Sequence, residues 1–129
     1  GNEIRYVQKI DQVLFCHGGV RDEFVKGTVE AEKYDDVDEV VRTINEFHHD
    51  LMWNGISPIW YRPQYSSWKM YGEDQALQVV GHTPVEAIYR RGSVISCDVF
   101  STYRDGSPIG SREFPIIDTK TWEFQGVKY

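Results

Sequence analysis

Residues 13–20 read VLFCHGGV and residues 77–84 read LQVVGHTP, and the rest of the chain is organised around these two stretches. In each stretch a short apolar run, which predicts a buried strand, ends at a histidine beside glycine. Glycine lets the backbone turn sharply or approach a ligand closely. We therefore expect His17 and His82 to meet at one sheet edge and to share a site for a metal ion.

Further strands are predicted on both sides of these stretches. Their apolar patterns cover about residues 5–10, 12–16, 76–80, 87–90, 93–100, 114–118 and 121–127. Turns are expected at Asp11, at 91–92, at 105–108 and at 119–120. Residues 20–34 carry several charges and a weaker pattern, which predicts a loop.

One long helix is predicted after that loop. Asp35 or Asp36 caps its start, and Asn54-Gly55 end it. The apolar residues on one of its faces are Val37, Val40, Val41, Ile44, Phe47 and Leu51. Residues 56–72, rich in Trp, Tyr, Ser and Pro, are expected to form a structured loop of the kind that carries function. The sequence thus predicts an α+β fold, with residues 1–129 in a single domain.

Composition excludes several classes of protein. Hydrophobic residues make up 40% of the 129 residues, which is typical of a packed domain rather than a disordered chain. The net charge of −6 disfavours nucleic acid and anionic membranes as partners. Neither a membrane span nor a signal peptide is predicted, and two cysteines are too few for a disulfide framework. We therefore expect a cytoplasmic protein.

The motifs FCHGG at 15–19 and GHTP at 81–84 resemble the carboxy-terminal motif pair of calcineurin-like metallophosphoesterases, in particular their phosphoprotein phosphatase branch. Those enzymes hydrolyse phosphate esters with two metal ions in a β-sandwich flanked by helices. The order strand-HGG, helix, Trp/Arg-Pro loop, strand-GHTP and closing strands follows the family over nearly the whole chain. The resemblance implies the β-sandwich or mixed-sheet half of that fold, with one long helix, and a phosphate-ester substrate.

The resemblance also implies roles for four residues. His17 and His82 would bind the same one of the two metal ions, with Mn, Fe and Zn all open because imidazole suits each. Arg62, in the stretch WYRP, lies where relatives carry an arginine that holds substrate phosphate, although a surface arginine stacked on a loop aromatic is the alternative. Asp98 stands where relatives have an Asp-Thr-Gly turn, which implies that it supports a metal ligand, although a simple turn or cap is the alternative.

Three motifs of the family are absent from the chain: GDxHG, GDxxDRG and GNHE. Gly1-Asn2-Glu3 lacks the histidine of GNHE and stands about 15 residues before His17, so we reject it as that motif. Without a bridging carboxylate, nothing in the chain holds two metal ions about 3.5–4 Å apart around a nucleophilic hydroxide. We therefore expect the carboxy-terminal portion of a catalytic domain, with an incomplete metal site, no catalytic residue and no activity by itself.

The remaining histidines and cysteines are expected to be structural. His48 and His49 lie on the predicted helix, and no C-x-x-C spacing accompanies Cys16 and Cys97. Cys16 and His17 are strand neighbours that point to opposite faces, so they do not form a nucleophile–base pair, and we expect Cys16 to be buried.

Two functions follow from these patterns. The first is a metal-dependent phosphoesterase, completed by an amino-terminal half that this chain lacks. The alternative is a degenerate, non-catalytic binding or assembly module, which the missing acidic ligands and the four Trp and eight Tyr support. A half-domain exposes an apolar face or a free strand edge, so we expect it to form a homodimer through that face.

Overall fold

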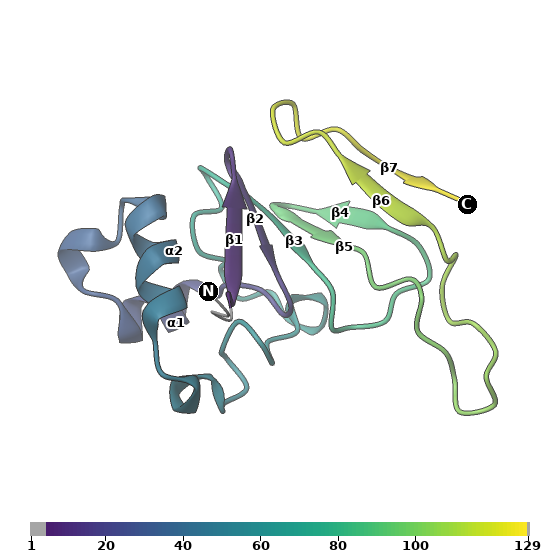
Figure 1. The fold of residues 1–129 in the computed structure, drawn as a ribbon, viewed down its shortest axis with the longest axis horizontal. Coiled ribbons are helices and arrows are strands. Elements are labelled where there is room, and N and C mark those ends of the chain that lie inside the picture. The colour runs from purple at the N-terminus through teal and green to yellow at the C-terminus, as the bar shows by residue number, and fades with distance from the viewer. Residues whose placement is uncertain (1–4, 129) are drawn as a thin grey trace.

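The computed structural model describes residues 5–128 and shows one main sheet between helices on one side and a β-hairpin on the other (Figure 1). The main sheet has the strand order β1-β2-β3-β5-β4. Its strands are β1 (Val7–Ile10), β2 (Val13–Cys16), β3 (Leu77–Val80), β4 (Tyr89–Arg91) and β5 (Val94–Ser96). The strands β2, β3 and β5 are parallel, whereas β1 and β4 run antiparallel to their neighbours. The hairpin consists of β6 (Phe114–Ile117) and β7 (Phe124–Val127).

Two α-helices and three short 3-10 turns connect the strands in the first half of the chain. The helices are α1 (Asp22–Thr28) and α2 (Val37–Glu46), and the 3-10 turns are η1 (Ala31–Lys33), η2 (His49–Met52) and η3 (Pro63–Tyr65). This arrangement confirms the predicted α+β class. The rejected Gly1-Asn2-Glu3 motif lies outside the described residues.

The two faces of the main sheet bury different side chains, because neighbouring residues of a strand point to opposite faces. Leu14 of β2 belongs to the core under the helices, together with Phe24 and Val25 of α1 and Ile44 of α2. Val13 and Leu77, with Val79 and Ile95, form the core on the other face. Ile117, Trp122 and Phe124 of the hairpin pack on that second core. Parallel strands need cover on both faces, and this chain supplies it.

A buried polar residue ties the central strand to the helical side. Gln78 of β3 is fully buried, and its side chain accepts from Val20 N at 2.7 Å and donates to Val20 O at 2.9 Å and Tyr71 O at 3.1 Å. A buried amide without these partners would cost about 1–3 kcal/mol. The bonds therefore fix the chain segment that follows His17, and with it the start of α1.

The predicted turns are confirmed. Asp11 and Gly92 both adopt a positive φ, of 53° and 59°. In the turn at 105–108, Ser107 N donates to Asp105 Oδ1 at 2.9 Å. In the hairpin turn, Lys120 N donates to Asp118 Oδ1 at 2.8 Å.

Two predictions about the helices are wrong. Residues 20–34 were expected to form a loop, but α1 lies within them. Phe24 and Val25 bury their side chains under the sheet, and this packing stabilises a helix that the charged local sequence does not indicate. The long helix does not reach Asn54-Gly55, since α2 ends at Glu46.

The residues beyond Glu46 therefore lie differently from the prediction. Phe47 turns to an extended conformation with φ −64° and ψ 143°, and its ring packs edge-on against Phe24 at 6.4 Å. Leu51, expected on the buried face, is exposed. His48 and His49 are not helical residues of α2 but begin the 3-10 turn η2, where His48 Nδ1 accepts from Asp50 N at 3.3 Å.

Within residues 5–128, the longest and most apolar helices fall short of what a membrane crossing requires.

Candidate metal centre

The parallel pairing of β2 and β3 brings His17 and His82 together. Cys16 is the register partner of Val80, so both strands end at the same level of the sheet. Gly81 N then donates to His17 O at 2.9 Å, which joins the two turns directly. The ring nitrogens His17 Nε2 and His82 Nδ1 lie 3.0 Å apart. The carboxyl ends of parallel strands are where open α/β sheets place their ligands.

The spacing of the two imidazoles fits a pair of ligands on one metal ion. Two nitrogens 3.0 Å apart, each about 2.1 Å from a common ion, subtend an angle of about 90° at that ion. Without metal, one ring donates a hydrogen bond to the other. With metal, both nitrogens need free lone pairs, so the protons belong on His17 Nδ1 and His82 Nε2.

Backbone and side-chain contacts hold His82 in place. The residue adopts a φ of 61°, a left-handed conformation that is costly for a side chain with a Cβ. Arg62 Nη1 donates to His82 O at 3.2 Å and to Thr83 Oγ1 at 3.1 Å. The Trp60 ring meets the His82 ring edge-on, with centroids 5.8 Å apart. The loop at 60–62 therefore supports the histidine from two sides.

The surroundings of His82 disfavour its protonated form. Burial, the Arg62 guanidinium and the neighbouring His17 hold the pKa of His82 below its ordinary 6.5. A backbone hydrogen bond at Trp60 and the charge of Asp98 act in the opposite direction but do not outweigh them. A neutral imidazole is the form that binds metal.

Gly18 allows the loop at 58–61 to pack against the histidine turn. A Cβ at this position would lie 2.6 Å from Tyr61 O and 2.8 Å from Pro58 O, both backbone atoms. Gly18 N instead donates to Pro58 O at 2.6 Å. Glycine is required here by close approach, and that approach delivers Trp60 and Arg62 to the histidine pair.

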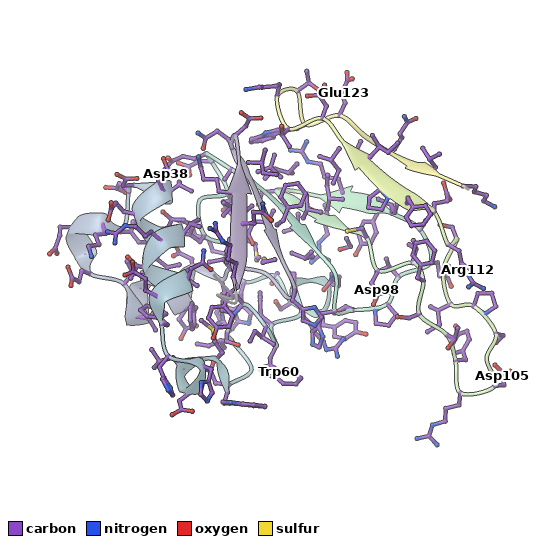
Figure 2. The ribbon with its side chains drawn as sticks, in the orientation of Figure 1. Asp38, Trp60, Asp98, Asp105, Arg112 and Glu123 are labelled. Atoms are coloured by element: carbon purple, nitrogen blue, oxygen red, sulfur yellow. The ribbon has the colours of Figure 1, made fainter. Side chains whose placement is uncertain are left out.

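Asp98 forms a turn at the same end of the sheet. Figure 2 shows Asp98 and Trp60 both near the end where β2, β3 and β5 finish. Ser101 Oγ donates to both Asp98 carboxylate oxygens, at 2.8 and 3.0 Å, and Val85 N donates to Asp98 O at 2.9 Å. These bonds are those of a residue that stabilises a turn. Support of a metal ligand by Asp98 stays a prediction.

The contacts that the structure shows for Arg62 are its hydrogen bonds to His82 O and Thr83 Oγ1. Among residues 5–128 it is Arg21 whose guanidinium lies over the Trp68 ring at 4.5 Å and the Tyr61 ring at 5.5 Å. Sequence reasoning missed Arg21, because the strand-to-helix segment that carries it was expected to be a loop.

The part of the chain that the structure describes offers no third ligand close to the histidine pair. Its one group of three metal-binding side chains within ligand distance is His48, His49 and Asp50, all exposed. An exposed group of this kind is common on protein surfaces, and we assign it no function.

The cysteines do not belong to the candidate site. Burial raises the pKa of Cys16 to about 12 and that of Cys97 to about 11, so both stay protonated thiols at neutral pH. Cys16 is half-buried against the helical core, while His17 next to it is exposed and turns to His82. Thiols of this kind are inert, in line with the sequence interpretation.

The fold is similar to that of solved phosphatases. A crystal structure of the cold-active protein-tyrosine phosphatase of a psychrophilic Shewanella species matches with a TM-score of 0.51 and 20% identity, over 96% of this chain and 43% of that one. A crystal structure of a point mutant of a cold-active protein tyrosine phosphatase gives the same values. The chain thus spans less than half the length of these phosphatases. No protein-family model and no curated protein matches it.

At this identity the likeness shows the fold alone, a phosphatase-like α+β fold. It does not single out the calcineurin-like metallophosphoesterases, whose motifs the sequence resembles.

The substitution Gly18→Ala tests the close approach at the site. We expect it to lower the free energy of unfolding by about 1–3 kcal/mol, because a Cβ meets two backbone carbonyls. Gly27→Ala is the matched control: its Cβ meets nothing within 4 Å in α1, and alanine favours a helix, so stability stays equal or rises by up to about 1 kcal/mol. Urea denaturation measures both, and equal effects would contradict the assignment.

The lowered pKa of His82 predicts a pH response. NMR titration of the histidine ring protons is expected to give a midpoint below 6.5 for His82, and Arg62→Gln is expected to move it upward because it removes a positive charge. Because His82 resists protonation only in the folded state, its contribution to stability is complete above pH 6.5 and is lost as the pH falls through its folded pKa. A wild-type midpoint at or above 6.5 would refute this reading.

Proposed function

We propose that this chain is the carboxy-terminal part of a metal-dependent phosphoesterase, in which His17 and His82 bind one metal ion. The observation that carries the proposal is the 3.0 Å approach of the two ring nitrogens at the ends of parallel strands. The fold likeness to phosphatases supports phosphatase chemistry at a coarse level. The HGG and GHTP motifs support the calcineurin-like family in particular.

The residues of this chain then have separate roles. His17 and His82 would supply two imidazole ligands, and a divalent Mn, Fe or Zn ion would provide an activated water and a Lewis acid when bound. Arg62 is proposed to bind the phosphate. Both of its hydrogen bonds to the GHTP turn come from one guanidinium nitrogen, Nη1. A guanidinium carries five N–H donors, so the other groups of Arg62 are suited to hold a phosphate oxygen. Asp98 moderates the charge near His82.

The acidic ligands are proposed to come from the part of the protein that this chain lacks. A centre of two ions needs bridging and terminal carboxylates, and the described residues provide none within ligand distance of His17 and His82. The substrate class is a phosphate ester. The cytoplasm is the proposed compartment, which two free cysteines with raised pKa values support.

Manganese binding and turnover test this function. In the isolated chain, Mn²⁺ is expected to broaden the NMR signals around His17 and His82 only at high concentration, and His82→Ala abolishes that broadening. His49→Ala is the control, since His49 is exposed and its ring contacts Asp50, whereas His17 and His82 contact each other. In the gene product that contains this chain, His82→Ala is expected to lower kcat/KM for an aryl phosphate by more than about 100-fold. Absence of any metal-dependent turnover in that gene product would reject the proposal.

The second candidate function is an assembly module, and the outer face of the hairpin favours it. Phe114, Ile116 and Val127 are 38–52% exposed, and the pairing of Phe114 with Val127 places them on one face. An exposed apolar face of this kind is typical of an interaction surface. We propose that a second copy of the chain covers it.

Sedimentation velocity tests the dimer. We expect the isolated chain to associate at high concentration, and Ile116→Lys to shift it toward monomer because a charge interrupts the apolar face. Gln12→Lys is the matched control, because Gln12 is exposed and lies outside the hairpin. A monomer over the whole concentration range would exclude the homodimer.

A further inference from the structure

A row of four aromatic rings leads from the surface into the candidate metal centre. The His17 and His82 ring centroids lie 4.7 Å apart, Trp60 follows at 5.8 Å, and Trp53 lies 5.9 Å beyond it. The Trp53 and Trp60 rings are inclined by 34°, while Trp60 meets His82 edge-on at 80°. Both are geometries that aromatic pairs prefer.

The outer two rings of this row are unusually open to solvent. Trp53 is 70% exposed and Trp60 is 42% exposed, so the pair leaves a large apolar surface uncovered. Tryptophan contributes more apolar area than other residues, and leaving it in water forgoes that stabilisation. Yet the backbone around Trp60 is firmly held: Trp60 N donates to Ser57 O at 3.1 Å, and the buried Ser57 Oγ donates to Met52 O at 2.8 Å. These backbone bonds therefore hold Trp60 in its exposed position.

Position and charge indicate what this surface receives. Trp60 contacts the proposed metal ligand His82, and Arg62, two residues further on, places a positive charge beside the same ring. A ligand that fits this surface has an anionic group, which lies at the histidines and Arg62, and a flat apolar group, which lies on the two tryptophans. Phosphate esters of aromatic alcohols have this shape.

We propose that Trp60 and Trp53 bind the aromatic group of an aryl phosphate ester whose phosphate lies at His17, His82 and Arg62. This substrate class rests on the proposed phosphoesterase function. The two tryptophans are positioning residues, which align the ester without taking part in bond cleavage. Stacking on one tryptophan changes affinity by about 10-fold, so aryl esters are favoured over alkyl esters by that order.

The test compares an aryl and an alkyl ester in the gene product that contains this chain. Trp53→Leu is expected to lower kcat/KM for phenyl phosphate by about 3- to 10-fold and to leave kcat/KM for glycerol 2-phosphate within about 2-fold. Trp60→Leu also removes a contact with His82, so it is expected to lower kcat/KM for both esters and to lower that for phenyl phosphate about 10-fold more. Trp68→Leu is the matched control, because Trp68 is 63% exposed but lies over Arg21 rather than beside His82. Equal losses for both esters, or none, overturn the proposal.

A binding measurement separates this proposal from the phosphoesterase function. With Mn²⁺ present, phenylphosphonate is expected to bind the gene product about 10-fold more tightly than methylphosphonate, and Trp53→Leu is expected to reduce the difference to about 3-fold or less. Equal affinity for the two phosphonates overturns the aromatic site. The same result is expected if another part of the protein covers Trp60. Tighter phenylphosphonate binding without turnover instead leaves the aromatic site standing and rejects the phosphoesterase.

Discussion

The candidate site depends on the register between β2 and β3. Since Cys16 pairs with Val80 in a parallel ladder, the two strands end together, and the bond from Gly81 N to His17 O extends the pairing into the turns. A shift of one residue would send one histidine to the opposite face of the sheet. The buried side chains on both faces, Leu14 toward the helices and Val13 toward the hairpin, oppose such a shift. The register of β2 and β3 therefore determines both the packing of the core and the geometry of the site.

The second requirement is the loop that crosses over the histidine turn. Gly18 has no room for a side chain, because the carbonyls of Pro58 and Tyr61 occupy that space. The same close approach sets Trp60 against His82 and allows Arg62 to hold the His82 carbonyl. Gly18 thus positions Trp60 beside His82, although 64 residues separate Gly18 from His82 in the sequence. A single small residue links the histidine pair to the aromatic row.

The turns and the positions of the strands could be predicted from the sequence because their signals are local: apolar runs bounded by Asp or Gly. The strand bounds could not, since the predicted strand at 93–100 is only Val94–Ser96 and that at 121–127 is only Phe124–Val127. The helix α1 could not, since its stability comes from Phe24 and Val25 under a sheet that the segment itself does not reveal. The apolar period from Val37 continues to Leu51, yet Phe47 leaves the helix to pack on Phe24. The two histidines were predictable as a pair through their strand ends. The contact of Trp60 with His82 was not, because no sequence pattern encodes a loop crossing.

The charges around the histidine pair bear on the proposed metal site. The two imidazoles lie beside the Arg62 cation, and its charge helps to lower the pKa of His82. A divalent cation entering this surface meets the same repulsion, while the Asp98 carboxylate is held by Ser101. The isolated surface is therefore better suited to an anion such as a phosphate group than to a metal ion. Carboxylates from elsewhere in the protein would reverse that preference, and the two imidazoles would then complete a site that neither part forms alone.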